Sequence, residues 1–142
     1  MRVLAVVLGI ALLVGCKNSS SSQETDKGTC KQMLVVTPDI SPEVDPTLKV
    51  KALSLKKNCL TLRVGYAACA GFDLDLVFNG RAKKSLPPQV DLVLSNKGEP
   101  CDIAQAVEQE FCFDISKLQA LSDNGKVVVR IQGYDESVVY SY

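Results

Sequence analysis

The sequence contains no histidine, and this absence excludes several common kinds of active site. A Ser-His-Asp or Cys-His site uses an imidazole as its general base, and many zinc centres use histidine as a ligand. Enzymes that rely on carboxylates, lysine or tyrosine remain possible. We therefore expect a protein that is not an enzyme, or one that uses an uncommon catalytic design.

The chain also lacks an excess of charge of either sign. Its 16 basic residues balance its 16 acidic residues, and neither kind forms a long run. Nucleic-acid-binding proteins usually gather lysine and arginine on one face to neutralise phosphates. The composition therefore predicts no nucleic-acid partner.

The longest apolar run is too short to cross a membrane. It covers residues 3–14, which are 12 residues interrupted only by a glycine, and it follows Met1 and Arg2. A membrane-spanning helix needs about 20 such residues, whereas the hydrophobic region of a signal peptide needs fewer. Residues 1–15 therefore predict a signal peptide.

The end of this run resembles the lipobox of bacterial lipoproteins, because Leu13-Val14-Gly15 leads directly into Cys16. This resemblance implies cleavage before Cys16 and attachment of acyl chains such as palmitate, usually three, which hold a protein firmly where one chain would not. An ordinary secretory signal with an incidental cysteine is the alternative. No cofactor and no metal are expected from the sequence.

Residues 16–29 predict a flexible tether after the anchor. They contain four consecutive serines and no large apolar residue, so they cannot bury enough surface to offset the entropy of ordering the backbone. Lys17 replaces the aspartate that keeps many Gram-negative lipoproteins in the inner membrane. This resemblance favours the outer membrane of the cell envelope, on its periplasmic or its surface side.

Residues 30–142 predict a single β-domain. Apolar residues alternate with polar ones in short segments, which is typical of strands that bury one face. We expect an antiparallel β-sandwich of Greek-key shape with about seven or eight strands and a short helix over 117–121. The chain has no tryptophan, and the likeness to immunoglobulin domains is one of shape only. The expected strands are 33–37, 48–55, 60–66, 72–78, 90–96, 107–115, 126–132 and 138–142, with a turn at Asn79-Gly80.

Five cysteines remain once Cys16 is assigned to the lipid. An exported chain matures in an oxidising compartment, so disulfides are expected, but an odd count leaves one thiol over. Strand register places Cys59 and Cys112 on the polar faces of their strands, where they can bond if the strands are neighbours. The interpretation is Cys59–Cys112 and Cys69–Cys101, with Cys30 unpaired. A four-cysteine zinc site is the alternative, although the sequence has no C-x-x-C pair.

Asp73 and Asp75 share one face of their expected strand. Alternation with Leu74 and Leu76 predicts that this face is in solvent. With Lys83 they are also the best candidates for carboxylate and lysine chemistry.

Several segments resemble small envelope lipoproteins of the NigD-like kind. They are "YAACAGFDLDL" (66–76), "SLPPQVDLVL" (85–94), "CDI" (101–103) and "FCFDIS" (111–116). Cys69 and Cys101 occupy the two cysteine positions of that pattern, whereas its glycines are replaced by Ala67 and Ala68 and its histidine is missing. The resemblance implies a surface or periplasmic β-domain without an assigned activity.

The resulting hypothesis is a non-enzymatic, lipid-anchored binding or scaffolding domain of the envelope. Its partner would be an envelope protein or a glycan, engaged by loops such as 79–88 and 96–106. The alternatives are an envelope enzyme, an enzyme inhibitor that presents a disulfide-pinned loop at 96–106, and a subunit that pairs through an exposed strand edge.

Overall fold

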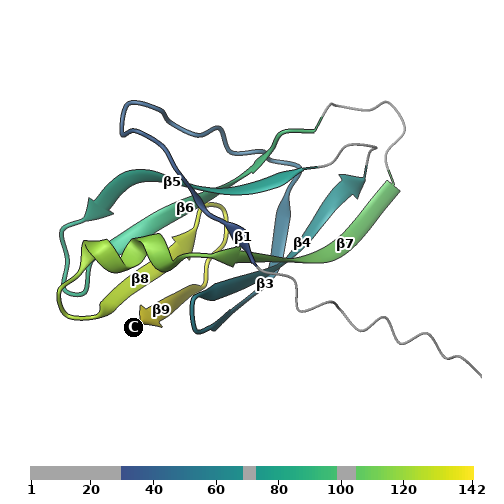
Figure 1. Cartoon of the computed structure of the whole chain (residues 1–142). Coiled ribbons are helices and arrows are strands. Elements are labelled where there is room, and N and C mark those ends of the chain that lie inside the picture. Colours follow the sequence, from purple (N-terminus) through teal and green to yellow (C-terminus); the bar gives the residue numbers. More distant parts are fainter. Residues whose placement is uncertain (1–29, 69–72, 99–104) are drawn as a thin grey trace, which may run out of the picture.

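The computed structural model describes residues 30–68, 73–98 and 105–142. These residues fold into two β-sheets that pack face to face (Figure 1). The predicted signal peptide, Cys16, the tether, Cys69 and Cys101 lie outside the described residues, so the hypotheses about them stay predictions.

Each sheet joins strands that are distant in the sequence. The first sheet has the order β1-β7-β4-β3, from β1 (Lys31–Gln32), β7 (Gln105–Asp114), β4 (Cys59–Ala68) and β3 (Lys49–Lys56). The second has the order β2-β5-β6-β8-β9, from β2 (Leu34–Val35), β5 (Leu74–Lys83), β6 (Gln89–Asn96), β8 (Lys126–Ile131) and β9 (Ser137–Ser141). The predicted short helix is a 3-10 helix over Ser116–Leu121.

The predicted β-sandwich is confirmed, but its sheets are mixed and not purely antiparallel as expected, and the described residues form nine strands. Four strand pairs are antiparallel, whereas β1/β7, β2/β5 and β6/β8 are parallel. After β6 the chain crosses to the other sheet as β7, passes through the 3-10 helix and returns as β8. A crossover of this length brings a strand back in the same direction, which a tight hairpin cannot do.

The first described segment connects both sheets. The sequence predicted one strand over 33–37, but the structure has β1 in the first sheet and β2 in the second. Met33 lies between them, fully buried, and its amide donates to the Asp114 carbonyl at 3.1 Å. The segment thus crosses from one sheet to the other at a core residue.

Alternation positions the core as the sequence predicted. Inward-facing residues of β4, β5, β6 and β8 form one cluster between the sheets. The residues that alternate with them along each strand point away from this cluster. The inward residues of β4, for example, are Leu60, Leu62 and Val64, all fully buried.

The prediction of a turn at Asn79-Gly80 was wrong, because both residues lie inside β5. The register with β6 shifts between Phe78 and Ala82, and Gly80 has a φ of +74° there. A β-bulge uses a glycine at such a position because other residues resist a positive φ. The same dipeptide signal therefore marks a bulge here and not a hairpin.

Gly125 offers a test of the turn before β8. Its φ is +66°, and a Cβ atom there would lie 2.8 Å from the Tyr142 carbonyl oxygen. Gly133 also has a positive φ, +83°, but a Cβ there would meet no atom within 4 Å. We expect Gly133→Ala to lower the free energy of unfolding by about 1–2 kcal/mol through strain alone. Gly125→Ala should cost about 1 kcal/mol more because of the clash. Urea denaturation of both variants measures the difference, and equal costs would contradict the clash.

Candidate functional site

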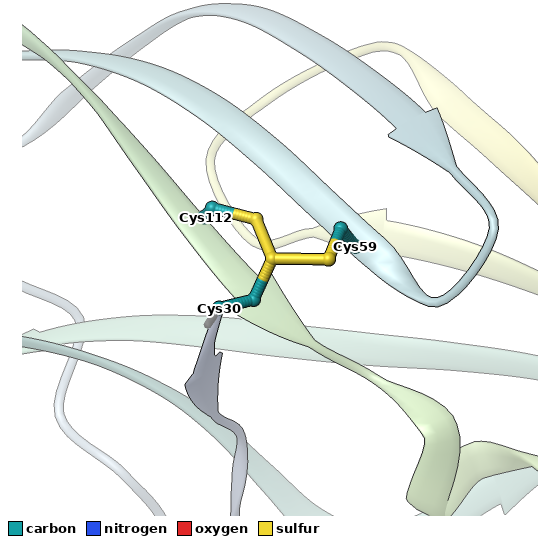
Figure 2. A group of neighbouring side chains, drawn as sticks. All are labelled: Cys30, Cys59 and Cys112. Carbon is teal, nitrogen blue, oxygen red and sulfur yellow. A yellow bond between two sulfur atoms is a disulfide. The ribbon is translucent and has the colours of Figure 1, made fainter. Parts of the chain in front are cut away.

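Three cysteines meet on the first sheet (Figure 2). Cys30 directly precedes β1, Cys59 is the first residue of β4, and Cys112 lies on β7. Strand register explains the meeting. Cys59 pairs with Asp114 and Thr61 pairs with Cys112, so the two strand cysteines are diagonal neighbours, and the parallel Lys31–Phe113 pair brings Cys30 beside them.

The sulfur of Cys30 lies within bonding reach of both other sulfurs. The Cα atoms of Cys30 and Cys59 are 6.2 Å apart, and those of Cys30 and Cys112 are 4.9 Å apart. Both distances are in the range that a disulfide requires. The cluster of Cys30, Cys59 and Cys112 is called the cysteine triad below.

The triad corrects one part of the sequence interpretation. β4 and β7 are neighbours, which is the condition set for a Cys59–Cys112 bond. Cys30, however, is not apart from these cysteines, because its sulfur stands between theirs in Figure 2. Sequence reasoning left Cys30 unpaired. A two-residue strand such as β1 has no alternating pattern, so the sequence did not reveal that Cys30 lies beside β7.

The triad can perform two kinds of chemistry. Its three sulfurs all lie within 4.8 Å of one another, and each cysteine is half-buried. Oxidised, it can hold a disulfide, and reduced, three thiolates could hold a soft ion such as Cu(I) or Zn(II). The four-cysteine zinc site would need a fourth ligand, and Cys69 and Cys101 lie outside the described residues.

Asp75 is not on a solvent face as predicted, because its side chain is only 4% exposed. Its Oδ1 lies 2.7 Å from Lys31 Nζ, and its Oδ2 lies 2.6 Å from Lys97 Nζ. Asp73 is exposed, as predicted, and also contacts Lys31, at 2.6 Å. Lys31 thus fastens β1, at the edge of the first sheet, to β5 of the second.

The two ammonium groups decide the charge of Asp75. Burial raises the pKa of its carboxyl group, but hydrogen bonds from Lys31 and Lys97 and their positive charges outweigh burial, so the pKa lies below its ordinary value. The side chain is ionised at neutral pH and is not poised to donate a proton. Hydrogen bonds to Asp73 and Asp75 correspondingly raise the pKa of Lys31.

Lys83 does not join these carboxylates. It lies eight positions further along β5 than Asp75, a separation of about 25 Å in an extended strand. Its Nζ pairs instead with Asp91 Oδ2 at 2.8 Å. The predicted combination of Asp73, Asp75 and Lys83 is therefore not assembled.

A polar hollow of about 610 Å³ lies over the outer face of the second sheet. Its floor comes from β5, β6 and β8, which are adjacent in the sheet, and its rim comes from the proline-rich connection after β2 and the turn before β9. Its polar side chains include Asn79, Lys83, Asp91, Arg130 and Asp135. This set of residues is called the polar hollow below.

The sequence identified only part of this hollow. Asn79 and Lys83 belong to the predicted binding loop 79–88, although both lie on β5 and the loop itself begins after Lys83. Asp91 and Arg130 were missed, and they are direct neighbours in the parallel β6/β8 ladder. Their outward positions in "VDLVLSN" and "KVVVRIQ" are the signal that sequence reasoning could have used.

The described residues contain no helix that is long and apolar enough to cross a membrane.

Comparison with known proteins adds one likeness of fold. No protein-family model matches the chain, and no curated protein matches its sequence. The crystal structure of a protein of unknown function, DUF1344, from Bacteroides vulgatus matches with a TM-score of 0.51 and 17% sequence identity. The match covers 80% of this chain but only 56% of the other. It therefore supports the fold alone, and the resemblance to NigD-like lipoproteins stays a prediction.

Proposed function

We propose that this chain is a lipid-anchored protein of the cell envelope and a non-enzymatic binding module whose ligand is a glycan held in the polar hollow. The observation that supports the ligand class is the mixture of groups around the hollow. Lys83 and Arg130 donate hydrogen bonds, Asp91 and Asp135 accept them, and the Asn79 amide does both.

Sugars suit such a surface because each hydroxyl group both donates and accepts hydrogen bonds. The hollow carries charges of both signs, so it offers no strong attraction to a ligand of one charge. Asp91 and Lys83 already hold each other in place, which reduces the entropy that their side chains lose when a ligand binds. A hydroxyl-rich, nearly neutral ligand fits this balance best.

The anchoring part of the proposal depends on Cys16. The first described residues are fastened strongly: Lys31 pairs with Asp75, the Gln32 amide donates to Asp114 Oδ2 at 2.8 Å, and Met33 is buried. A tether that joins this domain to a membrane would enter the fold at these contacts. A firmly held first segment is therefore compatible with a tethered domain.

Labelling with palmitate tests the anchor. In a bacterial host we expect the full chain to incorporate radiolabelled palmitate and to sediment with membranes. The Cys16→Ser variant should incorporate no label and should move to the soluble fraction, because the acyl chains have no attachment point. A wild-type chain without label, or a variant that still sediments with membranes, would contradict the anchor.

Titration with a panel of neutral and acidic oligosaccharides tests the hollow. We expect Arg130→Ala and Asp91→Asn each to weaken binding by about tenfold or more, because each removes from the hollow a charged group that hydrogen-bonds the ligand. Arg63→Ala is the matched control. It removes an exposed arginine on the first sheet, where Arg63 pairs with Glu110 at 3.2 Å, and it should leave binding unchanged. Binding that both arginine variants weaken equally, or no binding to any member of the panel, would contradict the proposal.

Pairing through a strand edge is less well supported. The edge strand β3 carries three lysines among its eight residues, Lys49, Lys51 and Lys56. Lysines on an edge oppose pairing with another chain because they would have to lose their hydration. The enzyme alternative depended on Asp73, Asp75 and Lys83, which the fold does not bring together. The inhibitor loop 96–106 lies mostly outside the described residues.

A further inference from the structure

The triad contains more sulfurs within reach of one another than one disulfide can use. Cys30 is placed to bond with Cys59 and with Cys112, but a sulfur in a disulfide has one sulfur partner. In any one molecule the triad therefore holds at most one disulfide between its own members, and its third sulfur lies beside that bond. A thiolate next to a disulfide is the arrangement from which thiol–disulfide exchange proceeds.

We propose that Cys30, Cys59 and Cys112 form a thiol–disulfide exchange centre in which Cys30 is the shared partner. The thiolate of Cys112 attacks the sulfur of Cys30 in the Cys30–Cys59 bond. The Cys30–Cys112 bond forms, the Cys30–Cys59 bond breaks, and Cys59 leaves as a thiolate. The reverse step restores the first bond, and neither direction needs an oxidant or a reductant.

The fold supports both bonds similarly. Cys59 and Cys112 are fixed by the β4/β7 ladder, whereas Cys30 adjoins a strand of only two residues. The two bonds close segments of 29 and 82 residues, and the entropic benefit of closure grows only logarithmically with length. Loop length therefore gives neither bond a decisive advantage.

The third thiol gives the centre a function toward other molecules. All three cysteines are half-buried, so a small disulfide can approach the thiol from solvent. Attack by the thiolate on a disulfide R–S–S–R forms a mixed disulfide with one R–S group and releases the other as R–S⁻. Reduced triads need one such disulfide oxidant, for example glutathione disulfide, to form the internal bond with release of two thiols. The inference is independent of the polar hollow and of the lipid anchor.

Peptide mapping of the full chain tests the shared bond. The oxidised protein is quenched in acid, its free thiols are alkylated with N-ethylmaleimide, and it is digested with trypsin and a glutamate-specific protease. Cleavage after lysine, arginine and glutamate, except before proline, separates the cysteines of the domain into the peptides 28–31, 58–63, 64–81, 98–108 and 111–117. Every connectivity therefore has its own mass.

We expect the peptide of Cys30 linked to that of Cys59 and, in the same sample, linked to that of Cys112. The alkyl group should be on Cys112 in the first population and on Cys59 in the second. The ratio should return after reduction with dithiothreitol and reoxidation with glutathione disulfide. A single connectivity, a Cys59–Cys112 bond with alkylated Cys30, a bond from Cys30 to Cys69 or Cys101, or a ratio that depends on the route would each overturn the proposal.

Two matched variants test the reactive thiol. Cys59→Ser and Cys112→Ser each leave Cys30 with one partner and leave the triad without a thiol. With 5,5′-dithiobis(2-nitrobenzoate) under native conditions, each variant should release one equivalent of coloured thiolate fewer per chain than the wild type. Release equal to that of the wild type would overturn the proposal. Circular dichroism checks that both variants keep the β-fold, and a variant that loses it is replaced by the corresponding alanine variant.

Discussion

Replacing Lys31 and Lys97 together by methionine is expected to lower the free energy of unfolding at pH 7 by about 3–5 kcal/mol. The double variant leaves the Asp75 carboxylate, whose side chain is 4% exposed, without the two ammonium groups that contact it. Methionine retains most of the apolar length of lysine, so the loss reports the polar contacts of the two ammonium groups, which include a hydrogen bond from Lys31 to the Leu74 carbonyl at 3.0 Å, and not lost packing. Urea denaturation of both proteins measures the difference.

The dependence on pH should change sign in this double variant. In the wild type the folded pKa of Asp75 is below its unfolded value of 3.8. Its stabilising contribution is therefore complete above that value and is lost as the pH falls through the folded pKa. Without the lysines, burial raises the folded pKa, so the contribution of Asp75 is complete at low pH and is lost as the pH rises through the raised pKa.

Asp114 must be considered in the same acid range. A hydrogen bond from the Ser116 amide lowers its pKa, so it contributes to acid unfolding in both proteins. Its effect cancels when the wild type and the double variant are compared at each pH. The difference between the two curves then belongs to Asp75 and its lysines.

Lys83→Met is the matched control for this experiment. Lys83, the last residue of β5, also pairs with an aspartate, at 2.8 Å, but the side chain of its partner Asp91 is 41% exposed. An exposed pair contributes less than about 1 kcal/mol because water replaces the lost partner. Two results would contradict this role of the buried ion pair. One is a double lysine variant that loses no more unfolding free energy than Lys83→Met. The other is a double lysine variant whose stability falls with decreasing pH as that of the wild type does.

The alternation of the sequence predicted which side chains form the core, because a strand with one buried face repeats every two residues. It failed at Asp75 because that rule assumes that the other face is in solvent. β5 is buried on both faces from Leu74 to Phe78. Val77, an apolar residue in the polar register of "LDLVF", was the available sign that the outer face is covered there.

The candidate sites were harder to predict because they depend on which strands become neighbours. The triad requires β1 to pair with β7 in parallel, and a strand of two residues carries no periodic pattern. The polar hollow requires β6 to lie beside β8, which follows only after the chain has visited the other sheet. Local sequence patterns determine which face of a strand is buried. The two candidate sites depend instead on the order of the strands in each sheet.

Replacing Tyr140 by alanine is the other change with a large expected effect, about 3–5 kcal/mol of unfolding free energy. Tyr140 is fully buried although it lies on the edge strand β9. Its hydroxyl donates to Asn58 Oδ1 at 2.8 Å and accepts from Gln119 Nε2 at 2.7 Å. Alanine removes the ring from the core and the hydroxyl that joins these two side chains.

Two further variants separate these contributions. Tyr140→Phe keeps the ring and should cost about 1–2 kcal/mol, because Asn58 and Gln119 each lose a partner. Tyr142→Ala is the matched control, since Tyr142 is 42% exposed and its ring packs against that of Tyr140 with centroids 5.1 Å apart. It should cost about 1 kcal/mol. Equal losses of unfolding free energy for the two alanine variants would contradict a special role of Tyr140. A larger loss for Tyr140→Ala means that this core side chain fastens β9 to Asn58, the residue preceding β4.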